Sequence, residues 1–220
     1  QRILKSPVQI RIAVVDFALR ESVGESFGTP KQPACLHCVG SLIGIVMIKH
    51  NESMSSAFVQ SETLRPGYAI SRVINGGWQL AGGHGAVDRH SAIADFEKFL
   101  FSGINTFDCA DIYTGVESML GDFVGNIRNR YGTEMSESIK IHTKLVPDLQ
   151  MLKSCDGSYI EKIIDRSLRR LKIDQLHLVQ FFWWDLSVGT PIETMMSLKR
   201  LQEKGKIRYL GVTNWDAAQI

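Results

Sequence analysis

The sequence has few cysteines and no long hydrophobic run. Two of its 4 cysteines form a single Cys35-Leu-His-Cys38 pair, without the second pair that a zinc site needs or a thioredoxin-like context. The longest apolar run, Val39 to Ile48, is far shorter than the ~20 residues of a membrane-spanning helix. We therefore expect reduced thiols, no bound metal and no membrane span, in a cytoplasmic protein.

The chain also has little excess charge of either sign. Its 25 Lys and Arg residues nearly balance 23 Asp and Glu residues, which leaves a formal net charge of +2. Such a surface offers no electrostatic argument for binding nucleic acid or an anionic membrane. A small molecule or another protein is the expected partner.

The first part of the chain, residues 1–66, contains no motif that carries chemistry. Ile10 to Leu19 is compatible with a strand or a short helix, and Val39 to Ile48 with a buried strand. Gly24 to Pro33 is typical of a loop, because Gly, Ser, Thr and Pro are frequent there. We interpret residues 1–66 as a poorly defined N-terminal extension, unrelated to the domain predicted over 67–220.

The second part of the chain alternates regularly between strand-like and helical patterns. In two of the helical stretches, apolar residues recur at the spacing of one helix face. Short strand-like runs begin roughly 31 to 37 residues apart, near Arg72, Ile104, Ile139, Leu176 and Ile207. The helical stripes consist of Val116, Met119, Leu120, Phe123 and Ile127, and of Ile160, Ile163, Ile164, Leu168 and Leu171.

Local signals mark where two of these helices begin and where one ends. Ser158 with Glu161, and Thr190 with Glu193, have the spacing of capping boxes. Pro191 suits the first position of a helix, and a following Gly205 suits its end.

Parallel βα units at this spacing build either an open doubly wound sheet or a closed barrel. The glycines from Gly76 to Gly85 do not fit the G-x-G-x-x-G spacing that a dinucleotide-binding sheet shows after its first strand. The pattern therefore favours a (β/α)8 TIM-type barrel. Such a barrel needs about 250 residues, so we expect the chain to stop after about the fifth strand.

Polar residues follow the second and third predicted strands, at the end of a barrel where active sites lie. Asp108, Asp111 and Tyr113 follow the second strand. Strand alternation places His142 and Lys144 on one face of the third. A buried lysine needs a partner, and Asp108 on the neighbouring strand is the obvious candidate.

This combination of side chains suits general-acid catalysis. A tyrosine with a pKa near ~10 is a weak proton donor at neutral pH, and a neighbouring lysine cation is expected to lower that pKa. Tyr113 could then protonate a carbonyl oxygen while a hydride reaches the carbon. The hydride must come from a cofactor, because no side chain supplies one.

Several motifs together resemble the signature of the aldo-keto reductases, over about residues 68 to 220. They are Asp108-x-Ala110-x-x-Tyr113 followed by Gly115, Glu117 and Gly121; His142-Thr143-Lys144; Gly205-Lys206-Ile207-Arg208; and Gly211-Val212-Thr213-Asn214-Trp215.

The resemblance implies reduction of an aldehyde or ketone with NADP(H), bound across the mouth of the barrel. It implies catalytic roles for Asp108, Tyr113 and Lys144, with Tyr113 as the general acid. The cofactor-binding residues that it implies are Gly76, Gly77, Trp78, Asp108, Thr213 and Asn214.

One position departs from the family pattern. The family's histidine at the end of the fourth strand is replaced by Phe182, which cannot hydrogen-bond a carbonyl. His177 lies on the opposite face of that strand and is a poor substitute, whereas His84 in the first loop is a candidate donor. We predict that His84, Phe182 and Trp183 contact the substrate, and that the aromatic rings either stack on a planar substrate or form an ordinary barrel rim.

Two other functions remain compatible with the sequence. The chain could be a subunit that binds NADPH, turns over little and regulates a protein partner, as potassium-channel β subunits of similar fold do. It could also be an inactive, truncated product.

Overall fold

Five parallel strands form the centre of the structure. The computed structural model describes residues 13–14, 59–82 and 85–216. The parallel strands are β4 (Asn75–Gly76), β5 (Thr106–Asp108), β6 (Lys140–Leu145), β7 (Leu176–Phe181) and β8 (Ile207–Val212), which pair in that order. The prediction of βα units that form part of a (β/α)8 barrel is confirmed.

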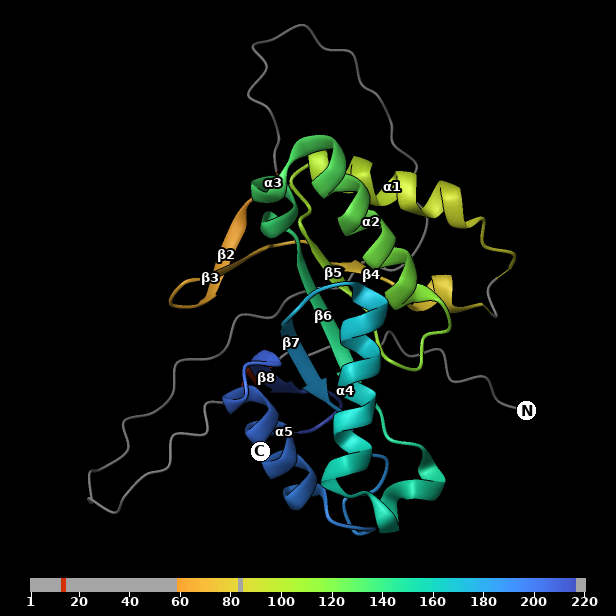
Figure 1. The fold of residues 1–220 in the computed structure, drawn as a ribbon, viewed down its shortest axis with the longest axis vertical. Coiled ribbons are helices and arrows are strands. Elements are labelled where there is room, and N and C mark those ends of the chain that lie inside the picture. The colour runs from red at the N-terminus through yellow and green to blue at the C-terminus, as the bar shows by residue number, and fades with distance from the viewer. Residues whose placement is uncertain (1–12, 15–58, 83–84, 217–220) are drawn as a thin grey trace, which may run out of the picture.

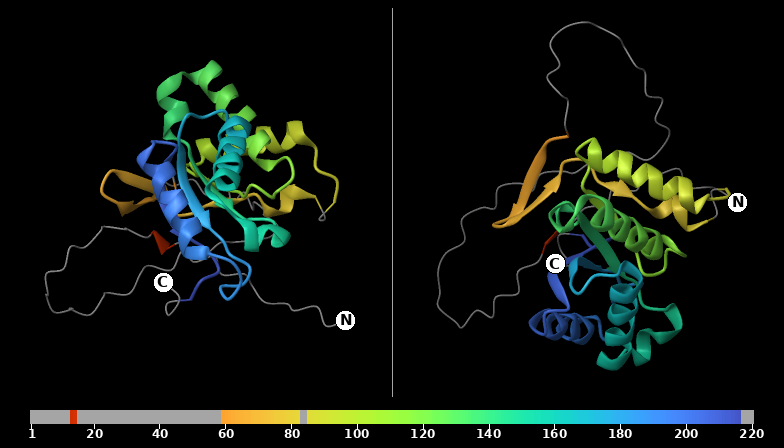
Figure 2. Two further views of the ribbon diagram at one scale, coloured as in Figure 1. Left: turned by 60° about the horizontal axis from the view of Figure 1, so that its bottom comes forward. Right: turned by 45° about the horizontal axis from the view of Figure 1, so that its top comes forward.

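Helices cover one face of this sheet and lie beside one another from α1 to α5 (Figures 1 and 2). Each long helix connects two successive parallel strands. The helices are α1 (Arg89–Phe101), α2 (Val116–Tyr131), the short α3 (Thr133–Ser138), α4 (Gly157–Leu171) and α5 (Pro191–Glu203), with 3-10 turns η1 (Trp78–Ala81) and η2 (Leu149–Ser154).

The main hydrophobic core lies between the helices and the sheet. The predicted stripe on α2 is buried throughout, and the stripe on α4 is buried except for the partly exposed Leu168. Alternate strand residues such as Ile141, Val179 and Phe181 complete this core. The inward-facing polar residues of the strands are thereby turned toward the barrel interior.

The helix starts differ in detail from the predicted caps. Asp156 caps α4 by accepting a backbone N–H of its first turn at 2.7 Å. Ser158 therefore lies inside the helix, and the predicted Ser158–Glu161 capping box is wrong, because the carboxylate two residues earlier already satisfies the helix end. Thr190 does precede α5, with Pro191 in the first turn, but its side chain makes no capping hydrogen bond.

A β-hairpin packs against the end of the sheet at which the parallel strands β5 and β8 begin. Its strands are β2 (Ser61–Arg65) and β3 (Tyr68–Ser71), joined by a turn in which Gly67 has a φ of 75°. The backbone N–H of Ser71 donates to Oγ1 of Thr106 at 3.1 Å, at the start of β5. The hairpin thus belongs with the barrel, and the predicted boundary at residue 66 falls within it, because period-based reasoning missed so short an element.

Most predictions for residues 1–66 lie outside the described residues. The predictions of a loop over Gly24–Pro33 and a strand over Val39–Ile48, and that for the Cys35–Cys38 pair, concern residues that the structure does not describe. Within Ile10–Leu19, the short strand β1 (Ala13–Val14) pairs antiparallel with the edge of β8. Among the helices that the structure describes, none is both long and apolar enough to cross a membrane.

Candidate active site

A buried ion pair joins the ends of β5 and β6. The ammonium group of Lys144 donates to Oδ2 of Asp108, and also to the carbonyl oxygen of Cys109 at 3.0 Å. Both charged side chains are almost fully buried. Burial alone would lower the pKa of Lys144, but the charge and hydrogen bond of Asp108 together with Tyr113 and Cys109 outweigh it, so the pKa is raised and the lysine stays charged. The predicted pairing is confirmed.

Tyr113 stands directly beside this ion pair. The Lys144 ammonium lies 5.3 Å from the centre of the tyrosine ring. Burial raises the pKa of Tyr113 by more than the Lys144 charge lowers it, and the Asp108 charge raises it further. The expectation that the pKa falls is therefore wrong, because burial of the phenol outweighs the charge of Lys144 and the charge of Asp108 acts in the same direction as burial. Tyr113 consequently keeps its proton at neutral pH.

Gln180 is a third partner of the ion pair, which the sequence reasoning missed. Its side-chain N–H donates to Oδ1 of Asp108 at 2.7 Å, so the two carboxylate oxygens have separate donors. Gln180 is fully buried on β7, opposite Lys144 on β6. The available signal was a polar residue at an inward strand position, two residues before Phe182.

The carboxylate of the loop after β5 is bonded to α4 and to the chain that follows β6. Asp111 accepts hydrogen bonds from Arg166 and from the backbone of Val146, each at 3.0 Å, and burial raises its pKa to about 7. Glu117 accepts from Thr143 at 2.8 Å and from Arg170 at 3.2 Å. These bonds attach the loop that carries Tyr113 to the helix α4, which holds the tyrosine in place.

Glycine lets the same two helices approach closely. A Cβ atom at Gly121 on α2 would lie 2.2 Å from the carbonyl oxygen of Arg170 on α4. No side chain fits at that distance, so this member of the sequence motif has a packing reason.

The end of β4 lies beside the ion pair. The backbone N–H of Gly77 donates to the carbonyl oxygen of Asp108 at 2.8 Å, and a Cβ at Gly77 would lie 3.0 Å from that oxygen. A Cβ at Gly76 would meet nothing within 4 Å. Trp78 is 52% exposed, and its ring contacts that of Tyr113 edge to face, at 5.1 Å between centres.

Polar groups also gather at the end of β8. The buried Thr213 donates its backbone N–H to the carbonyl oxygen of Phe181 at 3.1 Å, which keeps β7 and β8 in register. Asn214 follows with a left-handed φ of 62°. The ring of Trp215, the next residue, packs against the ring of Phe181, with 5.7 Å between the ring centres. A hydroxyl and a carboxamide thus stand at the same end of the sheet as Lys144.

A known protein family matches the part of the chain that carries these residues. The model of the aldo/keto reductase family matches residues 72–220. The chain belongs to the aldo/keto reductase family. It is 31% identical over 159 residues to the aldo-keto reductase YhdN of Bacillus subtilis, covering 70% of this chain and 46% of that protein. It is 32% identical over 168 residues to the 6-dehydroglucose reductase of Novosphingobium aromaticivorans, covering 70% of this chain and 51% of that protein.

Solved aldo-keto reductases have the same fold. One from Bacillus halodurans, in its holo form, is 26% identical with a TM-score of 0.56, covering 70% of this chain and 50% of that chain. One from Klebsiella pneumoniae, in complex with NADPH, is 25% identical with a TM-score of 0.54, covering 69% of this chain and 48% of that chain. The chain spans about half the length of the curated relatives YhdN and 6-dehydroglucose reductase, 46% and 51%.

The aromatic residues after β7 of this aldo/keto reductase chain divide between two environments. The partly exposed Phe182 contacts the ring of Trp184 at 4.9 Å, and Trp184 is itself exposed. Trp183 instead is buried in the hydrophobic core, where its N–H donates to the carbonyl oxygen of Val188 at 2.9 Å. The structure therefore brings Phe182 and Trp184 together and separates Trp183 from them. His84 lies outside the described residues.

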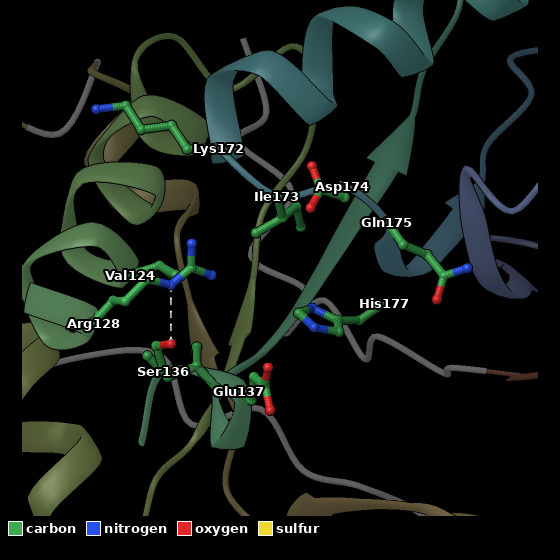
Figure 3. A pocket seen from close by; sticks show the side chains of 10 residues that line it. Val124, Arg128, Ser136, Glu137, Lys172, Ile173, Asp174, Gln175 and His177 are labelled. Atoms are coloured by element: carbon green, nitrogen blue, oxygen red, sulfur yellow. Dashed lines mark hydrogen bonds between the residues drawn. The ribbon is translucent and has the colours of Figure 1, made fainter. Parts of the chain in front are cut away.

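A cavity of about 230 Å³ lies at the opposite end of the strands from Lys144 (Figure 3). Its wall includes Ile139 and His177, next to the starts of β6 and β7, together with Arg128 of α2. The predicted position of His177, on the other face of its strand and near its start, is confirmed. This cavity is remote from the ion pair and from Tyr113.

Burial of two histidines makes the stability of the domain depend on pH. It lowers the pKa of His142 to about 3 and that of His177 to about 4, against about 6.5 in an unfolded chain. Below pH 6.5 the folded state therefore binds fewer protons than the unfolded chain. The stability that the two neutral histidines contribute is fully present above pH 6.5 and is lost as the pH falls toward their folded-state pKa values. Between pH 7 and pH 5 we expect His177 to account for a loss of about 2 kcal/mol.

Urea unfolding of wild type and His177→Asn at both pH values measures this contribution, because asparagine does not titrate there. An equal change between pH 7 and pH 5 in the two proteins would contradict the prediction.

Proposed function

We propose that this chain carries the catalytic centre of an NADPH-dependent reductase, which converts an aldehyde or ketone to an alcohol. The single observation that carries the proposal is the buried Lys144–Asp108 ion pair beside Tyr113 at the carboxyl ends of parallel strands. Relatives named as reductases support it, among them a pyridoxal reductase of Arabidopsis thaliana, 33% identical over 133 residues.

In this proposal Tyr113 is the general acid. Bound NADPH would supply the hydride for the carbonyl carbon. The Tyr113 hydroxyl gives its proton to the carbonyl oxygen, and the charge of Lys144 stabilises the phenolate left behind. Asp108 keeps Lys144 charged and in place. The raised pKa of Tyr113 ensures that the proton is present at neutral pH before the reaction.

The residues around the ion pair fit a nicotinamide cofactor. Thr213 and Asn214 offer a hydroxyl and a carboxamide, which can both donate to and accept from the cofactor's own carboxamide. Gly76 leaves open space where the ring would approach, and Gly77 brings β4 close to Asp108. The exposed face of Trp78 beside Tyr113 completes the proposed cofactor site.

We propose that the substrate lies against aromatic surface rather than against a hydrogen-bond donor. Phe182 and its ring partner Trp184 support this, because flat apolar rings bind planar substrates well. The position of Trp183 in the core speaks against the direct contact predicted for it. A donor role for His84 remains a prediction.

Phe182 also favours a second candidate, a subunit that binds NADPH and regulates a protein partner with little turnover. Without a donor at this position, the carbonyl oxygen would lose one of the groups that orient it. This candidate predicts cofactor binding without measurable reduction of aldehydes or ketones.

The proposal is tested first by titrating NADPH into the purified protein. We expect saturable quenching of tryptophan fluorescence in the micromolar range, with much less quenching in Trp78→Phe. Trp184→Phe is the matched control, because it removes another exposed indole outside the proposed cofactor site. Absence of quenching in a folded protein would refute the cofactor site, and binding without turnover of a carbonyl panel would favour the regulatory subunit.

A further inference from the structure

Two buried polar atoms near the ion pair need an explanation. They are Nδ1 of His142 and Oε1 of Gln180, and neither has a hydrogen-bond partner among the described residues. Both side chains are fully buried, on the neighbouring strands β6 and β7. Because buried polar atoms are nearly always paired, each of these atoms needs a hydrogen-bond partner.

The orientation of the Gln180 amide is determined by Asp108. An ionised carboxylate only accepts hydrogen bonds, so the NH2 group of the amide must face it, at 2.7 Å. The amide oxygen Oε1 then faces away from Asp108 and can only accept. Gln180 therefore requires a donor on its other side.

His142 can provide that donor in one of its two tautomers. Its Nε2 lies 2.9 Å from the hydroxyl oxygen of Tyr68. Burial raises the pKa of Tyr68 and lowers that of His142 to about 3, so both side chains are neutral. If Tyr68 donates to Nε2, the histidine proton is on Nδ1, which becomes the donor that Gln180 needs. In the other tautomer, Nδ1 of His142 and Oε1 of Gln180 would both be acceptors, and a single water would have to donate to both.

We propose that Gln180 is a positioning residue for the Asp108–Lys144 pair, and that Tyr68 and His142 hold it through one bridging water. The hydrogen bonds then run in one direction, from the Tyr68 hydroxyl through His142, the water and Gln180 to Oδ1 of Asp108. Oδ2 stays available for Lys144. A buried water suits this place because it has polar partners on both sides. The inference rests on the proposed function in one respect, namely that the Asp108–Lys144 pair assists Tyr113 as the general acid.

The tautomer of His142 is a direct test that needs no activity. In ¹⁵N-histidine NMR spectra at pH 7, we expect His142 of the wild type to carry its proton on Nδ1. Tyr68→Phe removes the hydroxyl that donates to Nε2, so this preference should be lost, whereas the signal of His177 should not move. A proton on Nε2 in the wild type would overturn the proposed series, since His142 would then donate to Tyr68 instead of passing its hydrogen bond toward Gln180.

The positioning role is tested with Gln180→Met, which keeps the shape but cannot donate. We expect the Lys144 ammonium protons to exchange with water about tenfold faster, measured by ¹⁵N NMR of the lysine side chain. Gln180→Leu is the second variant, because its apolar side chain cannot donate either. The control is Thr194→Val, which removes a buried hydroxyl from α5. Unchanged exchange in both Gln180 variants would overturn the inference.

Steady-state kinetics separates this inference from the proposed function. If the wild type reduces a carbonyl, Gln180→Met should lower kcat about tenfold and leave the KM for NADPH within about twofold. An unchanged kcat would overturn the positioning role. If the wild type reduces none of the carbonyls tested, the proposed function fails alone, and the exchange rate of Lys144 still decides the inference.

Discussion

Replacing Tyr113 with phenylalanine is expected to lower kcat for carbonyl reduction by about 10²- to 10⁴-fold, which is the usual contribution of a general acid. The substitution removes only the hydroxyl. The ring keeps its edge contact with Trp78 and its position near Lys144. Folding and NADPH binding should therefore be nearly unchanged, so that the loss falls on the chemical step.

Single-turnover measurements with saturating NADPH isolate that step. Tyr131→Phe is a matched control, because it removes the hydroxyl of an exposed tyrosine that bonds Glu97 on the surface. It should keep the wild-type rate. A Tyr113→Phe protein that reduces carbonyls as fast as the wild type would remove Tyr113 from the mechanism and leave the acid to another group.

Lys144→Met is expected to lower the free energy of unfolding by about 3–5 kcal/mol, the usual result of leaving a buried charge without its partner. Asp108 would keep only the hydrogen bond from Gln180. The reductase activity should be lost as well, because no cation would remain beside the Tyr113 phenolate. These two effects separate in Lys144→Met with Asp108→Asn, which should regain much of the stability and none of the activity.

The matched control for stability is Lys172→Met. Lys172 also forms an ion pair, with Asp122, but its side chain is 60% exposed and that of Asp122 is 33% exposed, against 7% and 5% for Lys144 and Asp108. Exposed pairs contribute about 0–1 kcal/mol. Urea unfolding should therefore distinguish the two lysines clearly, and equal losses would show that the Lys144 pair is not effectively buried.

Local sequence patterns were sufficient for the strand order and for most of the proposed site. The spacing of strand-like runs predicted the parallel βα units, and the alternation along β6 predicted that Lys144 faces Asp108. Both follow from periodicities of two and 3.6 residues, which act within one element. The carboxyl ends of parallel strands necessarily lie at one edge of the sheet, so a contact between residues of different strands could be predicted from the sequence.

Other long-range contacts were not predictable in this way. Gln180 belongs to none of the recognised sequence motifs. Its proposed role depends on β7 lying beside β6, with Gln180 opposite Lys144. The hairpin of β2 and β3 is too short for periodicity, and the Tyr68–His142 contact joins residues 74 positions apart. Trp183 and Trp184 are neighbours in sequence, yet one is buried in the core and the other is exposed.

The sequence by itself thus determined the family and the fold class, and it named the acid, lysine and aspartate of the mechanism that we propose. Only the tertiary structure decided the direction of the pKa change at Tyr113. The sequence places a cation beside the phenol, but the net effect depends on how deeply the ring is buried and on how closely Asp108 offsets that cation. Both are properties of the folded chain, because electrostatic effects depend on distance and burial and not on the order of residues.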